Sequence, residues 1–101
     1  MARVTFFRFK ALPGKRQAVI DQFVRWESEQ KSKATGFERS VLVSNNEDSD
    51  EFIAGVRFDT AEHYDANSQR AEQGEWFGEL RANLAADPEW FNGTLEREAQ
   101  G

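Results

Sequence analysis

The sequence predicts an α+β domain with a four-stranded antiparallel sheet and helices on one face. Runs of alternating apolar residues occur four times along the chain. Apolar stripes of helical period separate the first run from the second and the third from the fourth, and a short polar loop joins the middle two. The 101 residues suit a single domain, 1–101, with its core over about 3–97 and a frayed C-terminal tail.

The first strand is expected over Arg3–Phe9, where aromatic and β-branched residues follow one another. Pro13 and Gly14 end this strand. A helix should follow over Lys15–Lys33, because apolar residues there recur with helical spacing. Gly36 suits the exit from this helix into the next strand.

The second and third strands are expected over Phe37–Ser44 and Glu51–Phe58, paired as an antiparallel hairpin. Side chains alternate across a strand, so the third strand has one entirely apolar face, which ends in Phe58. That face should meet the helices. Arg57 then points to the opposite side of the sheet.

Thr60 is expected to cap a second helical region, which should break or kink at Gly74. Pro88 ends it, because a proline disfavours helix in the residue before it. A last strand should cover Glu89–Arg97, with a bulge at Gly93. This order of elements is the ferredoxin-like βαββαβ arrangement.

The sheet face away from the helices is expected to be only half polar. The first strand is apolar on both faces, and Trp90 and Phe91 are adjacent, so one of them points to each side. A second copy of the chain would cover such a face. The sequence therefore predicts a homodimer through the open sheet face, with Arg57 in a salt bridge across it.

Composition excludes several classes of protein. The chain has no cysteine and one histidine, which excludes disulfides and thiol nucleophiles and disfavours any zinc site, so no metal is expected. A net charge of −5 disfavours binding to nucleic acid or to an anionic membrane. No segment reaches transmembrane length, and a cytoplasmic location is expected.

Four stretches, taken with the order of elements, resemble the antibiotic biosynthesis monooxygenase domain of the dimeric α/β-barrel superfamily. They are "LPGKRQAVIDQF", Gly36-Phe37, "EFIAGVRFDTAEHYDAN" and "EWFGELRANLAADPEW". The resemblance runs from Val4 to Leu95 and implies a sheet-to-sheet dimer whose chains each hold a pocket between sheet and helices. Some members of that family oxygenate aromatic polyketide intermediates without metal or flavin, whereas others bind and degrade haem.

The family pattern matches this sequence in part. Tyr64 matches, but Phe58 stands where members often have Trp, and Asn67 stands where they often have His. The resemblance implies a cofactor-independent monooxygenase that acts on an aromatic or polyketide-like small molecule. A non-catalytic ligand-binding or interaction module is the alternative. Haem binding comes third, because the first strand also lacks the asparagine of the haem-degrading branch.

The candidate catalytic residues are Tyr64, Asn67 and Arg39. Tyr64 and Asn67 share nearly one helix face, where a phenol could assist proton transfer and an amide could hold an enolate oxygen. Arg39 shares a strand face with Phe37 and Val41 and would bind a substrate anion in the pocket. For each candidate a structural role, such as core packing or an exposed first-turn histidine, remains open. The candidate substrate-binding residues are Phe58, Trp76, Phe77 and His63.

Overall fold

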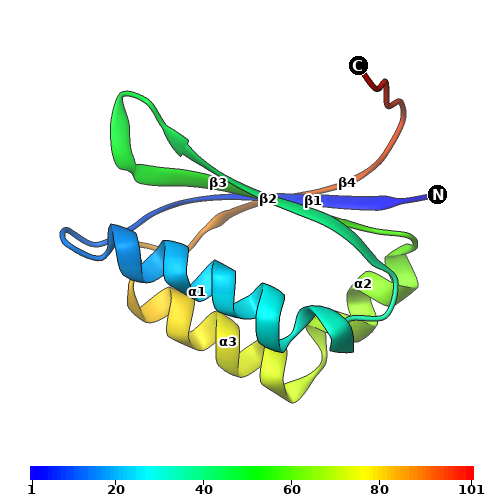
Figure 1. Cartoon of the computed structure of the whole chain (residues 1–101), viewed down its shortest axis with the longest axis horizontal. Helices are drawn as coiled ribbons and strands as arrows, with labels where there is room; N and C mark the ends of the chain where they lie inside the picture. Colours follow the sequence, from blue (N-terminus) through cyan, green and yellow to red (C-terminus); the bar gives the residue numbers. More distant parts are fainter.

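The computed structural model describes all 101 residues and has two layers, a four-stranded antiparallel sheet with every helix on one face (Figure 1). The strands lie in the order β2-β3-β1-β4, so the α+β class and the ferredoxin-like order are confirmed. A short 3-10 turn, Lys31–Lys33, follows the first helix. The elements are β1 (Arg3–Lys10), α1 (Arg16–Glu29), β2 (Phe37–Asn45), β3 (Asp48–Phe58), α2 (Ala61–Ser68), α3 (Ala71–Ala82) and β4 (Glu89–Thr94).

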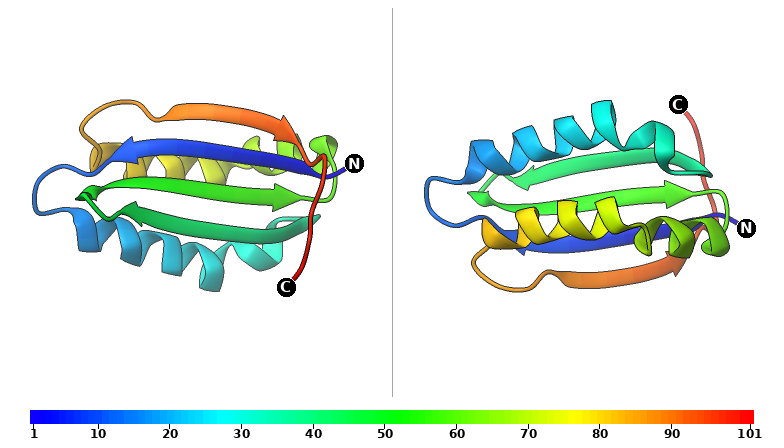
Figure 2. Two further views of the ribbon diagram at one scale, coloured as in Figure 1. Left: turned by 90° about the horizontal axis from the view of Figure 1, so that it is seen from above. Right: turned by 90° about the horizontal axis from the view of Figure 1, so that it is seen from below.

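The central strands β1 and β3 place their alternate side chains on two different surfaces. Phe7 pairs with Ala54 and faces the helices, whereas Phe6 pairs with Gly55 and faces the open side of the sheet. From below, α1 lies along the β2 side and α2 and α3 along the β1 side (Figure 2). The inner face of the sheet therefore forms a floor, and the helices form the walls and roof above it.

The core divides into two buried clusters. The larger one joins β1 and β3 to α1 and α3 through residues such as Phe52, Val19 and Leu80, each at most 2% exposed. The smaller one, at the other end of the helices, contains Trp26 and Phe58. Burying such side chains stabilises the fold by about 1.5–3 kcal/mol each. Members of both clusters, such as Phe7 and Trp26, also line a cavity between the sheet and the helices.

The second helical region consists of two helices, α2 and α3, but the break between them lies earlier than predicted. Thr60 caps α2, because its hydroxyl accepts from the His63 backbone N–H at 3.1 Å, as predicted. The predicted break at Gly74 is wrong: the chain turns at Gln69 and Arg70, and Gly74 lies inside α3. Arg70 has an extended backbone at the start of α3, which redirects the chain there.

The strand ends also differ from the expected ones. The hairpin turn is tighter than predicted, because β3 already begins at Asp48. The predicted bulge at Gly93 is wrong, since Gly93 stays in register opposite Val4. The last strand ends at Thr94, three residues earlier than expected.

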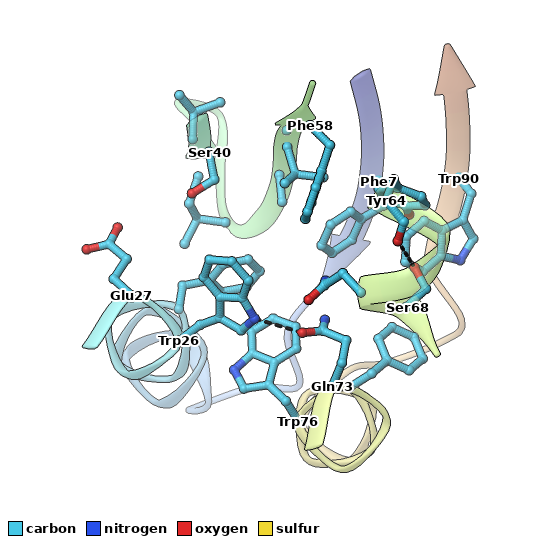
Figure 3. A pocket seen from close by; sticks show the side chains of 18 of the residues that line it. Phe7, Trp26, Glu27, Ser40, Phe58, Tyr64, Ser68, Gln73, Trp76 and Trp90 are labelled. Atoms are coloured by element: carbon cyan, nitrogen blue, oxygen red, sulfur yellow. Dashed lines mark hydrogen bonds between the residues drawn. The ribbon is translucent and has the colours of Figure 1, made fainter. Parts of the chain in front are cut away.

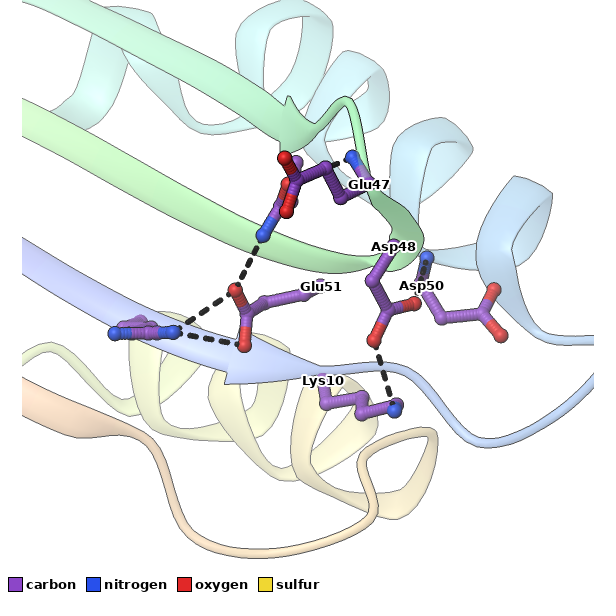
Figure 4. A network of polar contacts seen from close by, with 7 residues as sticks. Lys10, Glu47, Asp48, Asp50 and Glu51 are labelled. Atoms are coloured by element: carbon purple, nitrogen blue, oxygen red, sulfur yellow. Dashed lines mark hydrogen bonds and ion pairs between the residues drawn. The ribbon is translucent and has the colours of Figure 1, made fainter.

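Ion pairs link β1 to the end of the β2–β3 hairpin (Figure 4). Lys10 pairs with Asp48 at 2.9 Å, and its hydrogen bond and charge hold the pKa of the Asp48 carboxyl below its usual value. Hydrogen bonds from Asn45 and Arg8 likewise lower the pKa of Glu51. These groups are solvent-exposed, so their stabilising effect is small. None of the helices is long and apolar enough to cross a bilayer.

Candidate functional site

A pocket of about 340 Å³ lies between the inner face of the sheet and the three helices (Figure 3). Small-molecule sites typically occupy roughly 300–1,000 Å³ and are lined mostly by apolar side chains, so this pocket has the size and character of one. Twelve of its 19 lining residues are hydrophobic. Its aromatic walls are Phe7, Phe23, Trp26, Phe58, Tyr64, Trp76, Phe77 and Trp90.

All three tryptophans of the chain line this pocket, each from a different element. The Trp26 indole N–H donates to Gln73 Oε1 at 2.8 Å, and the Trp76 indole N–H donates to the Gln22 carbonyl at 3.2 Å. These bonds fix the orientation of both rings. They also leave neither N–H free, so both rings offer a ligand mainly apolar surface and π-faces.

Gln22 joins α1 to α3 behind the pocket wall. It is fully buried, and its amide N–H donates to the Trp76 carbonyl at 2.6 Å while Trp76 donates back to the Gln22 carbonyl. Because each residue binds the backbone of the other, the two helices cannot slide without breaking both bonds. The Trp76 side of the pocket is therefore held in place.

Asn67 is the one polar side chain in the lining that is more than nine-tenths buried, at 6% exposed. Its Oδ1 accepts from Arg70 Nε at 3.0 Å. A guanidinium can only donate, so this bond fixes which end of the Asn67 amide is oxygen. The amide nitrogen then points elsewhere, and the one side-chain hydrogen bond of Asn67 within the chain is that of its oxygen. Asn67 thus offers a hydrogen-bond donor to a pocket ligand.

Tyr64 lies at the sheet side of α2 and packs edge-on against Phe58, with ring centroids 5.6 Å apart. The Arg3 guanidinium lies 4.3 Å from the centroid of the Tyr64 ring, within cation–π range. The ring is therefore held by both neighbours. The Tyr64 hydroxyl forms no hydrogen bond within the chain and remains available to a ligand.

The pocket reaches solvent at its ends. Glu27 on α1 and Ser40 on β2 are exposed and lie together at one end (Figure 3). Trp90 on β4 and Ser68 on α2 are exposed at the other end. A ligand can therefore enter without unfolding of the core. Glu27 is the one carboxylate in the lining.

The structure brings together five of the seven predicted site residues. All five contribute to the lining of the one pocket, although they come from β3, α2 and α3. Phe58 is 1% exposed and forms part of the floor. The five are Phe58, Tyr64, Asn67, Trp76 and Phe77.

The prediction that Arg39 is a pocket cation is wrong. The strand register shifts between Phe37 and Arg39, so β2 bulges there and two of its residues oppose one residue of β3. Phe37 therefore pairs with Phe58 on the inner face, while Arg39 pairs with Arg57 on the open face. The Arg39 side chain is 65% exposed and lies on the opposite side of the sheet from the pocket.

His63 does not line the pocket either, so its predicted contact with substrate is not supported. Its Nδ1 lies 2.7 Å from Asp59 Oδ1, and this hydrogen bond, with the attraction between the two groups, lowers the pKa of the Asp59 carboxyl. Gly36 faces the same pair with φ +83°, and a Cβ there would come within 2.2 Å of Asp59 Oδ1. This cluster fixes the turn from β3 into α2.

Three contributors to the site were not predicted from the sequence. Trp26 and Gln73 bond to each other across the pocket from α1 and α3, and Arg70 orients Asn67. The helical stripe around Trp26 pointed to a buried ring but not to a cavity beside it. Nothing in the sequence separates Arg70 from the other arginines, because its partners come together only in the fold.

The open face of the sheet carries a second apolar surface, here called the open-face patch. Its members are 42–68% exposed although they are large and apolar. Gly55 lies among them, and a Cβ on it would meet Phe6 at 2.8 Å and Val41 at 3.3 Å, so these side chains lie flat over the glycine. The predicted interchain pair of Arg57 is instead intrachain, with Glu38 at 2.7 Å and Glu98 at 2.6 Å. The open-face patch consists of Phe6, Val41, Val43, Ile53 and Phe91.

Comparison with known proteins supports the fold across the whole chain. No family model and no curated protein matches the sequence. Among solved structures, a candidate antibiotic biosynthesis monooxygenase from Chloroflexus aurantiacus is 21% identical, with a TM-score of 0.80, over 100% of this chain and 98% of that one. A mutant of SnoaB, a cofactor-independent oxygenase from Streptomyces nogalater, is 15% identical, with a TM-score of 0.85, over 96% and 95% of the two chains.

The same fold also occurs in a conserved protein from Methanosarcina mazei, which is 14% identical with a TM-score of 0.84 over 95% of this chain and 94% of that one. Identities this low establish a common fold, and one fold can host unrelated activities. The chain therefore shares its fold with antibiotic biosynthesis monooxygenases, and what its own pocket does has to be argued from its own residues.

Proposed function

We propose that the pocket binds a planar aromatic small molecule. The observation that carries this proposal is the combination of aromatic walls with the unpaired Asn67 amide donor in a cavity of about 340 Å³. Flat rings can stack on Trp26 and Trp76, whose N–H groups are already occupied. A carbonyl or hydroxyl oxygen of the ligand would then take the Asn67 N–H.

We further propose that the chain is a cofactor-independent monooxygenase acting on such a molecule. In this reaction the substrate itself reduces dioxygen. For anthrone, loss of a ring-carbon proton gives an enolate, and that carbon transfers an electron to dioxygen and forms a C–O bond. The resulting hydroperoxide loses water, so anthrone and one O₂ give anthraquinone and one H₂O.

The pocket residues suit the first step of this reaction. Asn67 would donate to the enolate oxygen as its charge develops, which is the main form of catalysis available to a site without a cofactor. Glu27, the carboxylate at the mouth, would take the proton to solvent, and the Tyr64 hydroxyl would hydrogen-bond the hydroperoxide. The shared fold with SnoaB supports this proposal but does not carry it.

The test is dioxygen uptake with anthrone, followed with an oxygen electrode, and detection of anthraquinone. We expect wild-type chain to raise the rate above the uncatalysed one, and Asn67→Leu to lower that gain by about 10²-fold, as for loss of one oxyanion donor. His63→Gln is the matched control, because His63 lies outside the pocket. Equal rates with and without wild-type chain would contradict the oxygenase proposal for this substrate class.

The alternative is a ligand-binding module without catalysis. Phe58 on the pocket floor adds no polar group, and few polar groups of the lining remain free, among them the Asn67 amide nitrogen and the Tyr64 hydroxyl. Saturable binding of anthraquinone without dioxygen uptake would favour this alternative. A haem seated in the pocket would have no histidine ligand from this chain, because the one histidine, His63, lies outside it.

We also propose that the chain forms a homodimer through the open-face patch. Patches of exposed apolar side chains on a monomer mark interaction surfaces. Here the apolar centre is flanked by charged groups, with Arg8 and Glu51 at one end and Arg57 and Glu98 at the other. A surface with both charge signs at both ends can meet a copy of itself across a two-fold axis.

The dimer is tested by sedimentation velocity. Wild type should sediment as a dimer at micromolar concentration. Phe91→Asp, which places a charge on the most exposed aromatic ring of the patch (68% exposed), should sediment as a folded monomer. A wild-type monomer at all concentrations would exclude the proposal.

A further inference from the structure

The guanidinium of Arg70 lies next to the pocket, where it is bonded to Asn67, and it forms no ion pair with a carboxylate. Arg70 is the N-cap residue of α3, at the turn after α2, and lies among the ends of α1, α2 and α3. Its Nε donates to Asn67 Oδ1 and its Nη1 to Gln30 Oε1, both at 3.0 Å. Both acceptors are neutral amides. Its third nitrogen, Nη2, is enclosed and has no hydrogen-bond partner.

Arg70 differs in this respect from the arginines that form ion pairs, which are Arg8, Arg25, Arg39, Arg57 and Arg81. Among the arginines without an ion pair, Arg70 is the one with a buried guanidinium nitrogen that has no hydrogen-bond partner. An enclosed charge without a counter-ion is costly, because water cannot solvate it fully. The arrangement therefore favours the arrival of an anion nearby.

The neighbouring carboxylate does not fill this role. Glu72 is close enough to feel the charge of Arg70, but its Oε2 accepts from Lys33 at 2.9 Å and from Gln30 at 3.2 Å. These hydrogen bonds, of which that from Lys33 has the larger effect, lower the pKa of Glu72. The Glu72 carboxylate is therefore paired with Lys33 rather than with Arg70. Gln30 thus separates the two charges, since it accepts from Arg70 and donates to Glu72.

Asn67 connects the guanidinium of Arg70 to the pocket through its polarised amide group. Its oxygen is bonded to the guanidinium, so the amide dipole has its negative end on Arg70 and its positive N–H end free for a ligand. Hydrogen bonds in such a chain polarise one another, and a donor bonded through its other end to a cation becomes stronger. The low exposure of Asn67, 6%, limits screening by water.

The other charged or titratable groups that line the pocket are few. Glu27 stands at the exposed mouth between α1 and β2, and Tyr64 stands on α2 with the Arg3 guanidinium on its ring. The strands β1, β2, β3 and β4 contribute no ionisable side chain to the lining, and neither does α3. Arg70 is therefore the charged group in direct hydrogen-bond contact with Asn67.

We propose that the pocket binds its aromatic ligand as the anion, a phenolate or enolate whose oxygen accepts from Asn67 Nδ2, and that Arg70 is the positioning residue that orients Asn67 and supplies the charge. This inference rests on the proposed aromatic ligand and specifies its ionisation state. It also explains why a guanidinium is kept bonded to two amides rather than to the nearby Glu72.

The test uses 2-hydroxyanthraquinone, whose phenol and phenolate differ in visible absorption, and anthraquinone, which has no hydroxyl. Absorbance titration of the bound probe in wild type should give a pKa below that of the free probe. In Arg70→Gln the bound pKa should rise by about one unit, so affinity for the phenolate falls about 10-fold. Affinity for anthraquinone, whose carbonyl carries no full charge, should fall much less than affinity for the phenolate. Arg25→Gln removes an exposed arginine and should leave the probe pKa as in wild type.

A second variant keeps the test decisive if Arg70→Gln does not fold. Asn67→Asp places a carboxylate against Arg70 and removes the donor, so the probe should bind as the neutral phenol with a raised pKa. A bound pKa equal in wild type and Arg70→Gln, or still lowered in Asn67→Asp, would overturn the inference while leaving the aromatic pocket intact. Failure of both probes to bind wild type would instead overturn the proposed function itself, and the inference with it.

Discussion

Replacement of Ala54 by leucine tests directly whether the pocket is an empty, fillable space. Ala54 is 1% exposed, lies on the inner face of β3 and lines the pocket. In a fully packed core, adding carbons at such a position costs roughly 1–3 kcal/mol. Here the three added carbons can enter a cavity of about 340 Å³ instead.

The expected gain follows from the apolar surface buried. At about 0.8 kcal/mol per buried carbon, three carbons stabilise the fold by at most about 2.4 kcal/mol, and incomplete packing reduces this to roughly 1–2 kcal/mol. A domain of this size shifts its melting temperature by about 4–8 °C per kcal/mol. We therefore expect Ala54→Leu to melt higher than wild type and to bind anthraquinone at least about 10-fold more weakly, because the leucine occupies ligand space.

Ala11→Leu is the matched control. Ala11 is also 1% exposed and lies in the same core cluster, but it does not line the pocket. The same substitution should therefore overpack the core and lower the free energy of unfolding by roughly 1–3 kcal/mol. Urea unfolding of both variants measures the contrast. The reasoning would be refuted by equal destabilisation in the two variants, since Ala54 would then face packed atoms rather than a cavity.

Three further predictions concern the scaffold around the site. Gly36→Ala should lower the free energy of unfolding by at least about 1–2 kcal/mol, because its φ of +83° disfavours a side chain and its Cβ would strike Asp59; unchanged urea unfolding would contradict this. His63→Gln should raise the pKa of Asp59 toward its usual value, as measured by NMR titration of the carboxyl group. Because that pKa is lowered in the fold, the stabilisation is present above about pH 3.8 and is lost as pH falls below it. The free energy of unfolding of the variant should therefore decrease less than that of wild type over this acid range. Gly78→Ala should raise stability by about 0.5–1 kcal/mol in thermal melts, because Gly78 lies within α3 with open space around its Cβ; a lower melting temperature would argue against it.

The order of elements could be predicted from the sequence because periodicity changes clearly at each boundary. Breaks within a helix are harder to predict. Gly74 was expected to end a helix, since glycine costs helix stability, yet the packing of α3 overrides that preference. The turn occurs at Arg70, whose extended backbone has no strong local signal in the sequence.

The error at Arg39 has a single physical cause. Alternation along β2 places Arg39 with Phe37 only if the strand is regular, and the register shift between these two residues moves Arg39 to the other face. A one-residue bulge cannot be seen in a single sequence. The predictions for Tyr64 and Asn67 did not depend on strand register, since helical spacing alone placed both on the sheet side of α2, and both line the pocket.

The role of Arg70 beside the pocket could not be predicted from the sequence. Its importance depends on Asn67, Gln30 and Glu72, which come from three different segments and meet only in the fold. The buried Nη2 atom without a hydrogen-bond partner, which only the structure reveals, is what singles out Arg70.

The most direct test of the aromatic pocket is a tryptophan fluorescence titration with anthraquinone. Because all three tryptophans line the pocket, the whole intrinsic signal reports on it. The pocket account predicts saturable quenching with one ligand per chain, and weaker binding in Ala54→Leu. Quenching that never saturates and matches that of free N-acetyltryptophanamide would contradict it, because the rings would then meet the ligand only by collision.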